Sequence, residues 1–231
     1  MAHARLALFW GWLAAGCQGA AASSPPSALA SAPTAHADGE ASAANREVSN
    51  ASFDTSSWGT FHSKRFELSL PLPDGSSWKI DDHGSHWLKA EHERTNSTLW
   101  LRSWAEDRIV TRGDCYARAR EWNSSLPDLA ELSLVDDRTL LLFGEKETRV
   151  VAGVDEGASP RSVGFVVAVA GDVRRCFVVA YRTQATGADV PLAVADRLAF
   201  VADRLLPSVK PDPSFSPPRV PARGIGAGQG R

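Results

Sequence analysis

Apolar and polar residues alternate through the middle of this 231-residue chain, and the alternation predicts strands. From Phe66 to Leu72 every second residue is apolar, which is the period-two pattern of a strand with one buried face. Pro71, Pro73 and the turn at Asp74-Gly75 should end that strand. Apolar runs predict further strands at 78–81, 86–92, 97–105, 138–143, 147–155, 162–170 and 173–182. We expect a turn at Gly171–Asp172 between the last two.

Two segments carry the signals of helices. Thr111 is followed three residues later by Asp114, which is the pattern of a capping box, and the helix that it begins should end before Pro127. After Pro191 apolar residues recur at helical spacing, and Pro207 should end this second helix; the residues are Val194, Leu198, Val201 and Leu205. The order strands, helix, strands, helix predicts an α+β fold, with an antiparallel sheet of about seven or eight strands packed by two helices.

This order of elements resembles the PsbP-like α/β/α sandwich, a group that includes many bacterial lipoproteins. The resemblance rests on Phe66-x-Leu68-x-Leu70-Pro71 and then Trp78, followed by a meander, a helix, a second run of strands and a long C-terminal helix. It implies a three-layer domain. It implies little about activity, because similar domains serve as binding modules, chaperones or accessory subunits.

The first seventeen residues have the layout of an export signal. Arg5 precedes a short apolar run, and Leu13-Ala14-Ala15-Gly16-Cys17 resembles a bacterial lipobox, which implies removal of residues 1–16 and lipid attachment at Cys17. The run is about half as long as a hydrocarbon core of ~30 Å requires. Two alternatives stay open: cleavage at Ala20-Ala21-Ala22 would give a secreted protein without Cys17, and the run could be a buried helix.

Composition divides the rest of the chain into three parts. Residues 17–52 are mostly Ala, Ser, Pro and Gly, which bury too little apolar surface to fold, so we expect a tether. Residues 53–206 have the size of a single domain. Residues 207–231 are rich in Pro and Gly and should be a disordered basic tail, which either touches anionic lipid or peptidoglycan or is only solvated.

The export signal predicts a location in the envelope of a Gram-negative-type bacterium. Gln18 follows the lipobox cysteine, and because it is not aspartate, a sorting rule known for some such envelopes favours the outer membrane over the inner one. The lipid bilayer is then one partner, through Cys17. An unidentified envelope protein is the other partner that we expect.

Charge and motifs narrow the function further. The chain has 25 Lys and Arg against 27 Asp and Glu, a formal net charge of −2, so it carries no basic footprint for nucleic acid. It has no glycine-rich phosphate loop, and we expect no cofactor.

Three cysteines are consistent with export. Cys17 is either lipidated or removed, which leaves Cys115 and Cys176 as an even pair in an oxidising compartment. We expect a disulfide between them. The alternative is two buried thiols, which would behave as small hydrophobic residues.

The best candidates for metal binding or catalysis are the histidines of one polar segment. His83 and His86 stand beside two aspartates, and His92 is close in sequence. Imidazoles and carboxylates are ligands of divalent transition metals. The spacing matches no known metal motif, so a polar loop is the other interpretation and we assign no metal site and no catalytic residue.

Tryptophans supply the candidate binding face. Six of the eight lie between Trp58 and Trp122, and Trp100, Arg102 and Trp104 share one face of a single predicted strand. Aromatic and arginine side chains on an accessible face favour contact with a partner or stacking on a sugar ring. A face covered by a helix would need the same rings as core.

Three functions are therefore open from the sequence. The first is a lipid-anchored, non-enzymatic binding or accessory domain of the envelope. The second is a secreted soluble protein or a metal-dependent hydrolase centred on His83, His86 and His92. The third is a structural protein associated with the cell wall through its basic tail.

Overall fold

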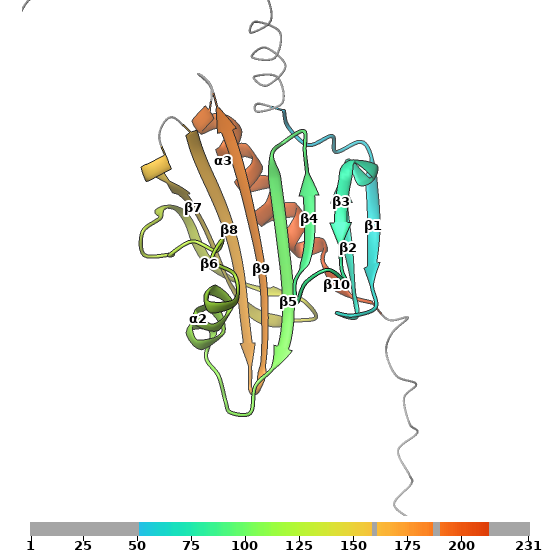
Figure 1. The fold of residues 1–231 in the computed structure, drawn as a ribbon, viewed down its shortest axis with the longest axis vertical. Coiled ribbons are helices and arrows are strands. Elements are labelled where there is room, and N and C mark those ends of the chain that lie inside the picture. Colours follow the sequence, from blue (N-terminus) through green and yellow to red (C-terminus); the bar gives the residue numbers. More distant parts are fainter. Residues whose placement is uncertain (1–50, 159–160, 187–189, 213–231) are drawn as a thin grey trace, which may run out of the picture. The chain divides into compact units, whose positions relative to one another are not determined.

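The computed structural model describes residues 51–158, 161–186 and 190–212, which form two β-sheets with helices (Figure 1). Helix α2 (Arg112–Trp122) and helix α3 (Val190–Phe200) pack on a seven-stranded antiparallel sheet, which confirms the predicted α+β fold. The signal, Cys17, the tether up to residue 50 and the tail from residue 213 lie outside the described residues.

The large sheet has the strand order β3-β4-β5-β9-β8-β7-β6. Its strands are β3 (Trp78–Asp81), β4 (Leu88–His92), β5 (Ser97–Ala105), β6 (Ser133–Leu142), β7 (Lys146–Asp155), β8 (Arg161–Asp172) and β9 (Arg175–Thr186). Two short 3₁₀ turns accompany it: η1 (Gly75–Ser77) directly precedes β3, and η2 (Glu156–Ala158) lies between β7 and β8. The inner strands β8 and β9 have buried residues on both faces, which explains why their sequences are apolar in runs instead of alternating.

The two helices cover opposite faces of this sheet. Both pack on β8 and β9, α2 against Val167 and Val169, and α3 against Val166 and Ala168. Successive residues of a strand point to opposite faces, so these contacts define three layers. The helix that begins with α3 continues through a π-helical turn η3 (Val201–Leu205) and a last turn α4 (Leu206–Ser208), so it ends one residue beyond Pro207 and not before it.

The helix signals in the sequence are confirmed in detail. Thr111 caps α2, its side-chain oxygen accepts from the Asp114 backbone N–H, and the Asp114 carboxylate accepts from the Thr111 backbone N–H. The apolar stripe of the second helix is buried throughout, at Val194, Leu198, Val201 and Leu205.

A second sheet of three strands, β1-β2-β10, was not expected from the sequence. It consists of β1 (Trp58–Ser63), β2 (Leu68–Pro73) and β10 (Lys210–Pro211). Pro71 lies inside β2 and does not interrupt it, whereas Pro73 is its last residue, so the strand ends at Pro73 and the Asp74-Gly75 turn as expected. Both are tolerated because β10 pairs only with Leu68 and Ser69, so one edge of β2 is open at both prolines.

Strand β10 lies in the segment that was expected to be the start of the disordered tail. Residues from 207 were expected to be disordered, yet Lys210 and Pro211 pair with β2, and the Asp212 backbone N–H donates to the Glu67 carbonyl at 2.9 Å. These contacts use the backbone, and backbone pairing leaves no apolar pattern in the sequence.

The turn between β8 and β9 lies two residues later than predicted. Val173 and Arg174 form it, and Val173 has a left-handed φ of 48°. Gly171 instead permits a close approach, since a Cβ on it would lie 3.1 Å from the backbone nitrogen of Arg112 at the start of α2. The glycine is therefore explained by helix packing and not by the turn.

The predicted disulfide is present. Cys115 of α2 and Cys176 of β9 are bonded across a sequence separation of 61 residues, and both are buried in the cluster under α2. Within the described ranges, no helix has the length and apolar character that a membrane crossing requires.

Candidate binding surface

The tryptophan face of β5 lies beside α2, on the same side of the sheet. Trp100, Arg102 and Trp104 point to this side, whereas Leu99 and Leu101 point into the core under α3. Because α2 packs mainly on β8 and β9, it leaves the β5 residues half-buried. The face is thus neither a closed core nor an open surface.

Three indole rings surround the Arg102 guanidinium. Its Cζ atom lies 3.6 Å from the ring centroid of Trp122, the last residue of α2, and 5.7 Å from that of Trp104. The third ring is Trp87, 5.9 Å away, which directly precedes β4 and is placed beside Arg102 by the β4–β5 register. We call Trp87, Arg102, Trp104 and Trp122 the arginine cage. Attraction between the guanidinium and the negative faces of the indole rings stabilises the arginine cage.

The charge of Arg102 has no acidic partner among the described residues. Its guanidinium makes no hydrogen bond or ion pair within that part of the chain, and its contacts are those with the rings. Burial, followed by the positive charge of Arg65, lowers the pKa of Arg102 from its ordinary value. Because the guanidinium makes no hydrogen bond or ion pair, its in-plane N–H groups have no partner among the described residues.

The neighbouring arginines are already engaged. Arg65 donates to the carbonyl oxygens of Asp82 and Ser85, at 2.9 and 2.6 Å. Arg118, whose Cζ atom lies 5.8 Å from the Trp122 centroid, pairs with Glu121 at 2.8 Å.

The indole N–H groups of the cage also differ in whether they have a hydrogen-bond partner. Trp104 donates to Glu106 at 2.8 Å. Trp87 is only 6% exposed and its indole N–H is buried, yet this N–H has no partner among the described residues. A buried donor without a partner costs free energy. The cage contains two kinds of donor without a partner in the described part of the chain, the Trp87 indole N–H and the Arg102 guanidinium N–H groups.

The structure does not gather the three candidate histidines. His83 and His86 are exposed and precede β4, which begins at Leu88 and not at residue 86 as predicted. His92 is buried, with Nδ1 2.7 Å from the Thr95 hydroxyl and Nε2 3.2 Å from the Asp74 carboxylate. Among the residues that the structure describes, no three His, Cys, Asp or Glu side chains are placed to hold a metal ion.

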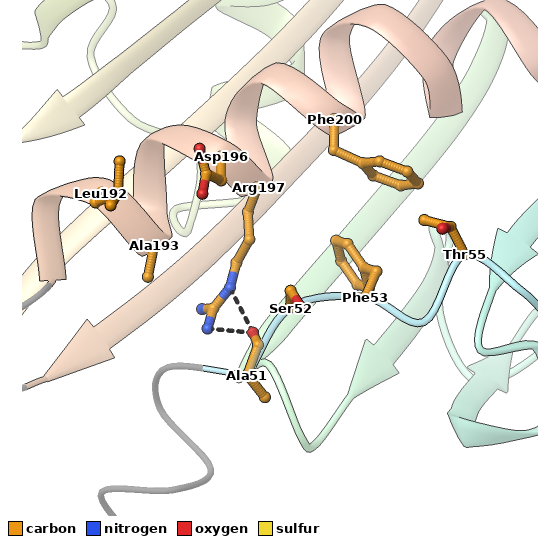
Figure 2. Close-up of a pocket in the computed structure, with 9 residues that line it drawn as sticks. All are labelled: Ala51, Ser52, Phe53, Thr55, Leu192, Ala193, Asp196, Arg197 and Phe200. Atoms are coloured by element: carbon orange, nitrogen blue, oxygen red, sulfur yellow. Dashed lines mark hydrogen bonds between the residues drawn. The ribbon is translucent and has the colours of Figure 1, made fainter.

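A hollow with a volume of about 590 Å³ lies between α3 and the segment that leads into β1 (Figure 2). Its lining includes Phe53, Phe200 and Arg197. The Arg197 side chain crosses from the helix to the carbonyl oxygen of Ala51, with both Nε and Nη2 donating, at 3.0 and 2.6 Å. The Ala51 carbonyl thus occupies the charged part of this hollow.

Arg197 and two other side chains hold the start of the domain in place. Arg197 also donates to the Thr95 carbonyl at 2.9 Å, and burial lowers its pKa. Arg94 donates to the Ser52 carbonyl, and the Asp74 carboxylate accepts from the Asp54 backbone N–H. Residues 51 and 52, expected in the tether, are therefore fastened to the domain. This makes the hollow a structural junction more than a ligand site.

Sequence reasoning missed half of the cage. Trp122 was recognised only as one of the clustered tryptophans, and Trp87 only as part of a predicted strand. Nothing in the sequence links them to Arg102, because residues 87, 102 and 122 meet only when β4, β5 and α2 are assembled. The clustering of tryptophans between residues 58 and 122 was the available signal.

No protein-family model matches the chain, and neither does any curated protein. Among solved structures, the Ran-binding protein Mog1p of Saccharomyces cerevisiae is 10% identical with a TM-score of 0.46, covering 68% of this chain and 97% of that one. LpqN, involved in cell envelope biogenesis of Mycobacterium tuberculosis, is 16% identical with a TM-score of 0.38, covering 67% and 90%. A Bacteroides thetaiotaomicron protein is 12% identical with a TM-score of 0.34, and the chain spans 46% of its length. These similarities carry no argument about function.

Proposed function

We propose that this protein is a non-enzymatic binding or accessory domain of a bacterial envelope, anchored through Cys17, that contacts a partner protein through the arginine cage. The single observation that carries the partner contact is the uncompensated guanidinium of Arg102 among three indole rings. Trp and Arg are the residues most enriched at the energetic centres of protein interfaces.

The position of the cage supports this role. Trp122 is 42% exposed, so the rim of the cage is open to solvent, while Trp87 at its base is buried. Nine residues of β5 pair with β9, and the disulfide joins α2 to β9, so β5 and α2 are both fixed to one strand. The side chains of the cage are thus held in position before a partner arrives, which lowers the entropy cost of binding.

The anchoring part of the proposal rests on the sequence. The lipobox resemblance at Leu13 to Cys17 and the long tether rich in Ala, Ser and Pro support lipid attachment, and the element order supports kinship with PsbP-like domains. A domain on such a tether can reach partners beyond the lipid headgroups.

Site-specific photocrosslinking in native envelopes tests the partner contact. A photoreactive residue at Glu121, next to Trp122, should give a discrete crosslinked species that Arg102→Gln abolishes. The matched control places the same photoreactive residue at Arg204, which is exposed on the opposite helix layer. Equal adducts from both positions, or adducts that persist in the Arg102→Gln protein, would refute a contact at the cage.

Membrane fractionation tests the anchor independently. Replacing Cys17 by serine should move the protein from the membrane fraction to the soluble fraction. An unchanged distribution would exclude lipid attachment at this residue.

A further inference from the structure

We infer that the arginine cage binds a carboxylate on a slim aliphatic stem, of the kind carried by a glutamate side chain of a partner protein. The inference rests on the proposed function, because it names the chemical group that the same surface recognises. It follows from the geometry, the charge and the lining of the cage.

The geometry leaves the in-plane N–H groups of Arg102 free to bind a carboxylate. One face of the guanidinium is stacked on Trp122, with 3.6 Å between Cζ and the ring centroid. Stacking uses the face and leaves the N–H groups in the plane unused. Two parallel N–H groups in one plane match the two oxygens of a carboxylate, so a bidentate pair can form without displacing the indole.

The charge of the cage favours an anion. Arg118 pairs with Glu121, and Arg65 donates to the neutral carbonyl oxygens of Asp82 and Ser85, so Arg102 is the guanidinium of this cluster whose N–H groups have no partner among the described residues. A carboxylate compensates one charge.

The lining of the cage favours a slim stem over a sugar ring. A sugar stacks flat on an exposed indole face, yet Arg102 covers Trp122 from 3.6 Å, and Arg118 lies 5.8 Å from the same centroid. Trp87 is almost completely buried. The two methylene groups of a glutamate side chain present little apolar area and can lie against the edges of the indole rings.

Ligand-observed NMR on the full chain in detergent micelles tests the inference. The probe is N-acetyl-L-glutamate methylamide, and its neutral isostere is N-acetyl-L-glutamine methylamide, at constant ionic strength. We expect saturation transfer from the protein to the glutamate compound and at least a fivefold weaker effect for the glutamine compound. Arg102→Gln should abolish the effect, and Arg102→Lys should lose most of it because lysine lacks the planar fork.

The matched control is Arg204→Gln, which removes an exposed arginine elsewhere and should leave binding unchanged. A urea unfolding curve of each variant shows that it is folded. Equal effects from the glutamate and glutamine compounds, or binding retained by folded Arg102→Gln, would overturn the carboxylate. Displacement by glucuronate at lower concentration than by the glutamate compound itself would overturn the protein side chain in favour of an acidic glycan.

The two experiments fail separately. Crosslinks at Glu121 without binding of the glutamate compound would leave the partner contact standing and overturn the carboxylate. Binding of the compound without crosslinks would support the carboxylate site and overturn the partner contact in the envelope.

Discussion

Removing the disulfide should cost this domain about 4 kcal/mol of unfolding free energy. Cys115 and Cys176 are 61 residues apart, and the loop-closure entropy of the unfolded chain gives roughly 4 kcal/mol at 25 °C for a loop of this length. Alanine is the appropriate replacement, because both positions are buried in an apolar cluster and a serine hydroxyl would lack a partner there. For a domain of this size the loss corresponds to a fall in Tm of about 8–16 °C.

Urea unfolding measures the effect directly. Tryptophan fluorescence of the parent chain and of the Cys115→Ala/Cys176→Ala protein should be followed with and without a phosphine reductant. The reductant should destabilise the parent chain to about the level of the double variant and leave the double variant unchanged. The slope of the free energy against urea should rise when the bond is absent, since the unfolded chain then expands further.

Two results would refute this reasoning. A loss below about 1 kcal/mol would mean that the unfolded chain keeps these residues together without the bond. A response of the double variant to the reductant would mean that the reagent acts elsewhere on the protein.

Three further predictions concern other buried residues. Arg197→Met should lower the unfolding free energy by at least about 3 kcal/mol in urea titrations, because the Ala51 carbonyl and other buried acceptors lose a charged donor; an unchanged midpoint would contradict the junction described above. Burial is the main cause that lowers the pKa of His92 below its ordinary value of 6.5. The unfolded imidazole therefore takes up a proton near pH 6.5 while the folded one does not, so stability should fall as the pH drops below 6.5, by at most about 1.4 kcal/mol per pH unit. His92→Asn should flatten this dependence, and an identical pH profile would exclude His92 as its source. Gly164→Ala should lower the unfolding free energy by about 1–3 kcal/mol and lower Tm, because the new Cβ would lie 2.5 Å from Cγ1 of Val194. An unshifted melting curve would show that α3 can move away from β8 without loss of stability.

The sequence predicted the elements whose signals are local. The capping box at Thr111, the apolar stripe of the second helix and most strands depend on residues a few positions apart, and all were placed within a few residues of their true bounds. The β6 strand is the largest deviation, since it begins at Ser133 and not at residue 138. Its first residues are exposed at the sheet edge, and exposed edge residues carry no burial pattern.

The second sheet could not be predicted by the same means. Strand β1 has only partly buried apolar residues, and β10 is two residues long, so neither has a period that can be recognised. Both exist because β2 offers unpaired backbone groups at its edges. Pairing of this kind depends on where distant segments of the chain meet.

By itself the sequence determined the α+β class and the two helices and predicted the pairing of Cys115 with Cys176, because period, caps and cysteine parity are properties of the chain. Only the tertiary structure decided what surrounds Arg102 and Arg197. A guanidinium acquires its environment from β4, β5 and α2, or from the segment before β1, and those contacts join residues up to 146 positions apart. The charge that defines the candidate site is therefore visible in the sequence, but its lack of an acidic partner becomes visible only once the layers are assembled.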